Sequence, residues 1–196
     1  MKRSANVFIC YAIVALFAGC SSTPPSRFYT LSPAMLSQTP HTGDYSVSVG
    51  PVSIPAAVDR PQIVVRTGPN QVYINEFDRW ASPLKADIAR VIAENLVSML
   101  GTPKVTVSTQ STSEGASYRT AIDVLSFESD PGKAATLDAL WTVSSNKDRN
   151  SIRQRTTITE TTEGADYASL AAAHSRALEQ LSREIAEAIK NMEKKK

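Results

Sequence analysis

The first twenty residues constrain this chain most, because they separate a short leader from the part that can fold. Two basic residues, Lys2 and Arg3, precede an apolar run from Val7 to Phe17. A helix that crosses a bilayer needs about 20 apolar residues, so this run is too short to be a stable transmembrane span. A charged start followed by a short apolar run is typical of a secretory signal. Residues 1–19 are therefore predicted to be a signal peptide.

Small residues stand directly before a cysteine at the end of this run, in the order Leu16-Phe17-Ala18-Gly19-Cys20. This order resembles the lipobox of bacterial lipoproteins, in which the cysteine takes a diacylglycerol and becomes the acylated first residue, carrying chains such as palmitate. The resemblance implies lipid attachment at Cys20; a plain secretory signal, or a buried Cys20, is the alternative. Ser21 replaces the Asp that retains enterobacterial lipoproteins at the inner membrane, which implies the periplasmic face of the outer membrane.

Composition excludes several classes of function. Without residues 1–19 the chain keeps 21 − 2 = 19 basic residues against 19 acidic ones, whereas a nucleic-acid binder usually needs a basic face. Both cysteines, Cys10 and Cys20, lie in the first twenty residues, so the rest has no disulfide, no zinc finger and no cysteine nucleophile. His41 and His174 are far apart in sequence. We therefore expect no His-rich metal site and no cofactor.

The predicted organisation is a lipidated cysteine with a tether over residues 20–27, followed by a single periplasmic domain over residues 28–196. Residues 21–26 are polar and contain two prolines, as linkers do. Phe28 to Leu31 is expected to be an edge strand, and Ser32 to Asp44, which contains His41, a loop.

Most of the domain reads as β-strands with turn residues between them. The further expected strands are Ser46–Val52, Ile63–Thr67, Gln71–Ile74, Lys104–Thr109, Tyr118–Asp130, Ala134–Ser145 and Ser151–Thr162. Residues 62–76 are predicted to form a hairpin around Gly68-Pro69-Asn70, and the last three strands an antiparallel set. In the middle strand Leu137, Ala139 and Trp141 share one face, while the opposite face is mostly polar. One face of the sheet is therefore expected to be exposed to water.

Two segments have helical periodicity. The first is expected to begin with Ser82 as N-cap and Pro83 at the first helical position, and to end at Gly101. The second is expected to begin after Asp166 as its cap and to place His174 at the edge of the core. It ends near three lysines, which favour the helix dipole or, alternatively, the phosphates of lipid headgroups.

This order of elements predicts an α+β domain, a mainly antiparallel sheet with two helices packed on one face.

No motif of a known catalytic site occurs in the sequence. Asp123, Glu128, Asp130 and Asp138 come from neighbouring strands, but nothing in the pattern draws them together, so a solvated face is the better interpretation. Serines and threonines are abundant, yet no histidine is evidently placed to activate one. We therefore expect that the chain is not an enzyme.

A family resemblance begins near Tyr45 and is carried by three segments in order: Val47 to Pro55, Ile63 to Arg66, and Trp80 to Leu84. With the lipobox and the early Phe28-Tyr29-Thr30-Leu31, they resemble the ABC-type transport auxiliary lipoprotein family. The residues carried over as its signature are Arg79, Trp80, Ser82, Pro83 and Leu84. Their physical interpretation is a capped strand-to-helix junction.

The resemblance implies an auxiliary lipoprotein that docks with an MCE-domain protein in a system moving lipids between the two membranes. It implies anchoring to the outer membrane, offers no catalytic residues to carry over, and leaves open a homo-oligomer. The alternative is a periplasmic carrier that itself binds a lipid or another apolar ligand, which needs an apolar cavity of several hundred Å³.

Overall fold

The computed structural model describes residues 24–35, 44–108 and 115–194 of the chain. Its elements, in chain order, are β1 (Arg27–Tyr29), β2 (Val47–Ser53), β3 (Gln62–Gly68), β4 (Gln71–Trp80), α2 (Leu84–Leu100), β5 (Val105–Val107), β6 (Tyr118–Asp130), β7 (Ala134–Ser145), β8 (Ser151–Thr161) and α3 (Tyr167–Lys194). None of the described helices is long and apolar enough to cross a membrane.

The main sheet has five strands in the order β5-β2-β6-β7-β8. Strands β6, β7 and β8 pair antiparallel over nearly their whole length, whereas β2 pairs in parallel with both β5 and β6. The predicted α+β class is confirmed, with a sheet that is mixed at one side. In β7 the side chains alternate between buried and half-buried, and Leu137, Ala139 and Trp141 lie on the buried face as the sequence predicted.

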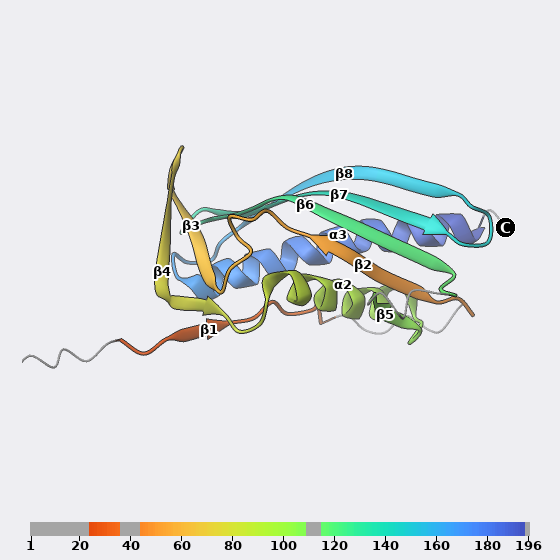
Figure 1. Ribbon diagram of the computed structural model, residues 1–196, viewed down its shortest axis with the longest axis horizontal. Helices are drawn as coiled ribbons and strands as arrows, with labels where there is room; N and C mark the ends of the chain where they lie inside the picture. The colour runs from red at the N-terminus through yellow and green to blue at the C-terminus, as the bar shows by residue number, and fades with distance from the viewer. Residues whose placement is uncertain (1–23, 36–43, 109–114, 195–196) are drawn as a thin grey trace, which may run out of the picture.

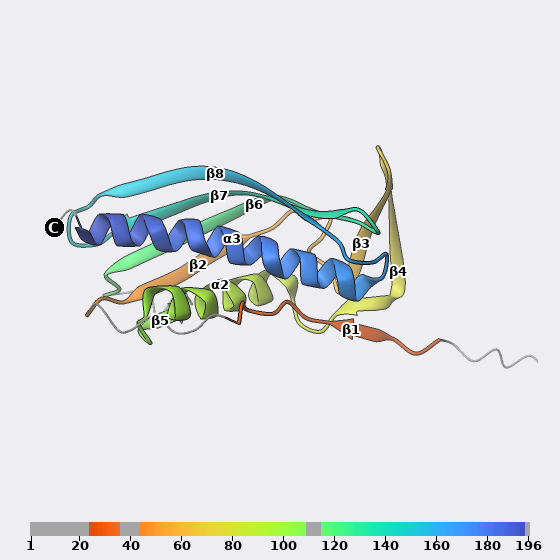
Figure 2. The same cartoon turned by 180° about the vertical axis from the view of Figure 1, so that it is seen from behind.

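Both helices cover the same face of this sheet, which leaves the other face to solvent (Figure 1; Figure 2). The two helices also pack against each other. The buried stripe of α3 includes Leu178, Leu181 and Ile185, none of which is exposed. Packing of one apolar stripe on one apolar sheet face closes a single core.

A second sheet of three strands, in the order β1-β4-β3, was not predicted from the sequence. The predicted hairpin over residues 62–76 is present as β3 and β4, but β4 continues to Trp80 and bends at a register shift. The predicted edge strand after the tether pairs in parallel with this extension, so that Phe28 lies opposite Arg79. The hairpin rises from one end of the molecule (Figure 1).

The first helix begins differently from the prediction. Pro83, not Ser82, is the residue before its first turn, and no side chain caps it; Pro83 has ψ 122° and its carbonyl accepts from the amides of Ala86 and Asp87. The expectation that Ser82 is the N-cap is therefore wrong, because the fixed φ of proline lets Pro83 itself make the extended-to-helical transition. Gly101 ends the helix with φ 63°, as predicted.

The last helix begins as predicted, since the carboxylate of Asp166 accepts a hydrogen bond of 2.7 Å from the amide of Ser169.

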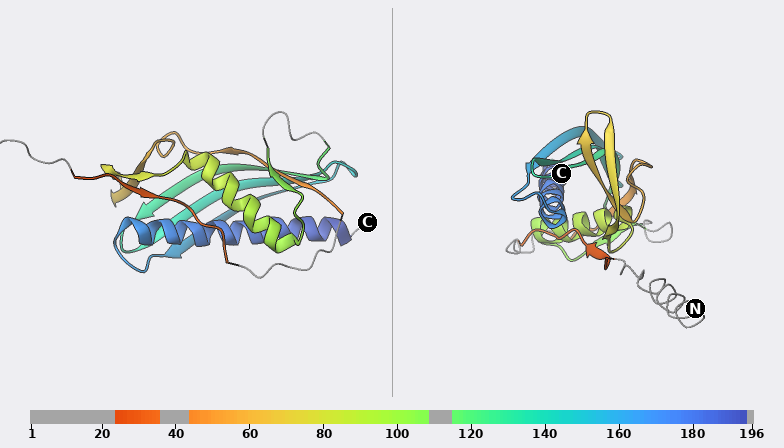
Figure 3. Two further views of the ribbon diagram at one scale, coloured as in Figure 1. Left: turned by 90° about the horizontal axis from the view of Figure 1, so that it is seen from below. Right: turned by 90° about the vertical axis from the view of Figure 1, so that its left-hand side faces the viewer.

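The molecule is elongated, and its two ends have different contents (Figure 1; Figure 3). The tether end contains β1, the β3–β4 hairpin, the β6–β7 turn at residues 131–133 and the start of α3. The far end contains the start of β6, the β7–β8 turn at residues 146–150 and the last turn of α3. A helix of 28 residues is about 40 Å long, so α3 separates the two ends by that distance.

Candidate functional site

The signature residues form the junction between β4 and α2. Trp80 and Leu84 are buried, whereas Ser82 and Pro83 are exposed. The amide of Trp80 donates to Pro61 and the amide of Ala81 to Tyr29, each at 2.7 Å, so the junction is tied to two other segments. The junction lines an open pocket of about 320 Å³. The other lining residues come from the preceding loop and are Asp59, Arg60 and Pro61.

Trp80 also begins a column of aromatic rings that joins three elements. Its ring meets Phe127 of β6 edge-on at 6.2 Å, and Phe127 stacks on His174 of α3 with ring centres 3.7 Å apart. His174 is completely buried, deeper than the core edge that the sequence suggested. The column therefore fixes the three-stranded sheet to the main body of the protein.

His174 makes a hydrogen bond of 2.8 Å through Nε2 to the hydroxyl of Ser129. This serine–histidine contact was not evident from the sequence, because strand pairing is what brings residue 129 against α3. Within the described residues, Nδ1 of His174 has no hydrogen-bond partner. Burial lowers the pKa of His174 to about 3, so the ring is neutral and weakly basic. A catalytic triad instead orients its histidine through Nδ1. The Ser129–His174 pair is therefore suited to a structural role between β6 and α3.

The four carboxylates noted in the sequence do not converge. Asp138 forms a two-pronged ion pair with Arg155, which holds the pKa of Asp138 below its usual value. The remaining partners are Arg66 for Glu128, Lys133 for Asp130, and the Ser53 hydroxyl for Asp123. Across the described ranges, no group of three or more His, Cys, Asp or Glu is placed to hold a metal ion.

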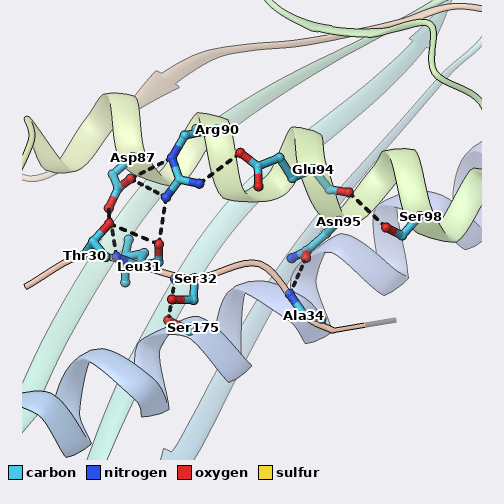
Figure 4. A network of polar contacts seen from close by, with 10 residues as sticks. All are labelled: Thr30, Leu31, Ser32, Ala34, Asp87, Arg90, Glu94, Asn95, Ser98 and Ser175. Atoms are coloured by element: carbon cyan, nitrogen blue, oxygen red, sulfur yellow. Dashed lines mark hydrogen bonds and ion pairs between the residues drawn. The ribbon is translucent and has the colours of Figure 1, made fainter. Parts of the chain in front are cut away.

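The segment that follows the tether is clamped onto both helices (Figure 4). We call residues 30–34 the strap. Asp87 of α2, which is buried, accepts 2.9 Å from the amide of Leu31 and 3.2 Å from the Thr30 hydroxyl. Arg90 donates to the carbonyl of Leu31 at 2.7 Å and pairs with Asp87 at the same distance. One carboxylate and one guanidinium thus bind both backbone groups of Leu31.

Two further contacts hold the second half of the strap. The amide of Ser32 donates to the Ser175 hydroxyl of α3 at 3.0 Å, and the amide of Ala34 donates to Asn95 of α2 at 2.8 Å (Figure 4). Asn95 is fully buried, and its side-chain amide donates a hydrogen bond to the Ser182 hydroxyl. Sequence reasoning missed this site. The available signal was that Asp87 and Asn95 are polar residues on the buried side of α2.

The strand just before the strap is fixed by a fully buried carboxylate. Asp78 of β4 accepts two bonds from Arg27, at 2.8 and 2.9 Å, and one from the Tyr29 hydroxyl at 2.8 Å. Burial and the hydrogen bond to Asp78 raise the pKa of Tyr29 to about 12. The first residues after the tether are therefore held in place by charge-assisted hydrogen bonds.

The two ends differ in how their cations are placed. At the tether end several arginines and lysines have acidic partners; examples are Arg27 with Asp78, Arg79 with Glu76, and Lys133 with Asp130. Two exposed cations there, Arg60 and Lys85, have no ion pair among the described residues. At the far end Lys104 pairs with Asp44. Several other cations there have no ion pair among the described residues. They are Arg119, Lys147, Arg149, Arg153, Lys190 and Lys194.

Cys20 and His41, two residues that the sequence singled out, lie outside the described residues.

A family model and two solved structures match this chain. The family model for the ABC-type transport auxiliary lipoprotein component matches residues 29–186, well over half of the sequence. A crystal structure of an uncharacterized protein is similar with a TM-score of 0.69 at 20% identity, covering 85% of this chain and 99% of the other. A Xanthomonas campestris protein of the DUF330 family has a TM-score of 0.63 at 22% identity, with 82% and 92% covered. No protein with a curated function matches. At these identities, the two structures support the fold alone.

Proposed function

The chain belongs to the ABC-type transport auxiliary lipoprotein family, and we propose that it is the outer-membrane-anchored docking component of an MCE-type lipid transport system. Membership makes it a transport-associated lipoprotein. The finer assignment is to a PqiC-like member, lipidated at Cys20 and facing the periplasm, whose partner is an MCE-domain protein. A homo-oligomer on such a partner is compatible with this role.

The observation that carries the proposal is the clamp on the strap. A lipid anchor positions a domain only when the chain that follows it is fixed to the fold. Arg27 and Leu31 are bound by the buried carboxylates Asp78 and Asp87 within a few residues of the tether. Seven residues span at most about 25 Å, so a lipid on Cys20 would keep this end near the membrane. An adaptor needs this kind of short, firm attachment.

Co-purification tests the proposal. Envelopes are solubilised in detergent, the full-length protein serves as bait, and partners are identified by mass. We expect an MCE-domain protein in the eluate from wild type. A Cys20→Ala variant, which should leave the outer membrane for the soluble periplasmic fraction, is the matched control for the anchor. The absence of any MCE-domain protein from the wild-type eluate would contradict the proposal.

A groove along the strap favours the carrier as the second candidate. It is open, has a volume of about 470 Å³, and runs between the strap and α3. Phe28, Pro33 and Ala172 are among its apolar lining residues. Its size is in the range of ligand pockets. Native mass spectrometry of the purified protein separates the two functions, since a carrier should retain one exchangeable phospholipid per chain and an adaptor none.

We also propose that the protein has no catalytic activity. Ser129 and His174 are the pair that most resembles catalytic machinery, and both are almost completely buried. The low pKa of His174 makes it a poor general base near neutral pH.

A further inference from the structure

We propose that the far end is the docking surface of this protein and that it binds an acidic segment of the transport partner. The inference deepens the proposed function, since it names the surface used and the chemistry of the segment it receives.

The far end lies opposite the end at which the tether leaves the domain (Figure 3). The tether leaves beside β1, and the start of α3 lies there too, because the Tyr29 and Tyr167 rings are 5.9 Å apart. The other end of α3 lies about 40 Å away, as its 28 residues require. With the tether end held at a membrane, the far end is the part of the domain that reaches furthest from that membrane (Figure 3).

The far end also carries a cluster of positive charges. The far-end cations without an ion pair belong to four elements: Arg119 to β6, Lys147 and Arg149 to the β7–β8 turn, Arg153 to β8, and Lys190 and Lys194 to α3. Three acidic residues stand among these cations: Asp148, which accepts a hydrogen bond of 3.4 Å from the Ser145 hydroxyl, and Glu187 and Glu193 of α3. The cations outnumber these carboxylates, so the surface has a net positive charge that carboxylates of a partner complement.

A pocket lies among these cations. It has a volume of about 520 Å³ and is formed between the β7–β8 turn and the last turn of α3. Ile152 and Met192 give it an apolar part, Asn150 and Asn191 give it amide groups, and Lys147 and Asp148 each contribute a charged group. Such a pocket suits a segment in which an apolar side chain stands between acidic ones. This mixed chemistry favours a protein segment over an inorganic anion.

The backbone at Arg149 supports the same surface. Among the described residues it is the one residue other than glycine with a positive φ, 52°. Non-glycine residues in this conformation are uncommon, and asparagine, aspartate or glycine would be more favourable there. An arginine held in such a turn is exposed. A guanidinium that binds the carboxylates of a partner would explain why arginine occupies a backbone conformation that it adopts unfavourably.

The other source of negative charge is a membrane rich in anionic headgroups. The far end is turned away from the membrane that holds the tether, so the structure favours the protein segment. Vesicles of phosphatidylglycerol provide the test of this competing occupant.

The first experiment titrates the lipidated mature protein, in non-ionic detergent, with a decaglutamate peptide, followed by NMR. We expect salt-sensitive shifts confined to the far end. Lys147→Glu with Arg149→Glu should weaken binding about tenfold at low salt, because two attractions become repulsions. Lys133→Glu reverses one charge at the tether end and should leave affinity unchanged. Arg149→Gly should weaken binding without lowering the melting temperature.

Three results would overturn the inference: no binding of the peptide, equal weakening by Lys133→Glu, or far-end binding to phosphatidylglycerol vesicles that is tighter than to the peptide. The second experiment repeats the co-purification with the same variants. If wild type retains an MCE-domain protein and the far-end variant retains as much, the docking surface is wrong while the proposed function stands. If wild type retains none, the proposed function fails and the peptide titration still decides the surface.

Discussion

The tether end buries acidic residues that arginines bind, whereas the far end exposes several cations that have no ion pair among the described residues. At the tether end Asp78 and Asp87 are buried and each is bound by an arginine and by neighbouring hydroxyl or amide groups. At the far end Lys147 and Arg149 are exposed and no ion pair engages them in the described part of the chain. Removing a hydrogen-bond partner from a buried carboxylate lowers the free energy of unfolding substantially, whereas exposed charges contribute little to it. The comparison indicates that the buried charges of the tether end stabilise the fold, whereas the exposed charges of the far end are available for binding.

The largest expected loss is at the aromatic column of the tether end. Trp80→Ala removes the ring that packs on Phe127 and should lower the free energy of unfolding by roughly 3–5 kcal/mol. Denaturant unfolding of the purified protein measures it. A loss below 1 kcal/mol would show that the three-stranded sheet does not depend on this column.

The next effect concerns the strap. Asp87→Ala leaves the buried amide of Leu31 without an acceptor and should cost about 2–3 kcal/mol. Hydrogen exchange should accelerate most at Leu31, and less in β7. Uniform acceleration over the whole chain would instead mean that Asp87 stabilises the fold generally and does not act as a local clamp.

A third prediction uses pH. The pKa of His174 is about 3 in the folded protein and about 6.5 when unfolded, so below pH 6.5 the unfolded state binds more protons. Stability should therefore fall as the pH decreases from 6.5 toward 3, by about 2 kcal/mol between pH 7 and pH 5.

His174→Phe is the control for this prediction, since it keeps an aromatic ring against Phe127 but cannot titrate. The pH-dependent loss between pH 7 and pH 5 should be smaller in the variant, whatever its absolute stability. An unchanged slope would show that the ring is not buried and neutral.

The smallest pair of effects compares two helix starts. Asp166→Ala removes a cap with a 2.7 Å hydrogen bond and should cost about 1 kcal/mol, whereas Ser82→Ala should stay within about 0.5 kcal/mol. Melting temperatures of the two variants decide it. Equal losses would restore Ser82 as a cap.

The sequence predicted the elements of the main sheet well, and the physical reason is their periodicity. Strands β6 and β7 begin and end at the predicted residues because alternation and turn residues mark both limits. The same reasoning placed the start of α3 through Asp166. It mistook Ser82 for a cap because serine before proline satisfies the usual pattern for a helix start, and the pattern does not tell which of the two residues makes the transition.

The second sheet and the strap could not be predicted in this way. Both depend on contacts between residues far apart in sequence, such as Arg27 with Asp78 or Leu31 with Asp87. Local patterns record which side chains are apolar, not which distant backbone a buried carboxylate will bind. The unpaired cations of the far end were equally hidden, because the balanced charge of the mature chain averages over both ends.

The orientation of the molecule tests the central claim most directly. The sequence contains no cysteine after Cys20, so Lys133→Cys and Lys147→Cys each provide one labelling site in the folded domain. The lipidated protein is placed in vesicles that contain an acceptor dye in the headgroup region, and energy transfer is measured from each site. The account predicts strong transfer from residue 133 at the tether end and weak transfer from residue 147, with distances that differ by roughly the 40 Å length of α3. Equal transfer from both sites, or stronger transfer from residue 147, would contradict it.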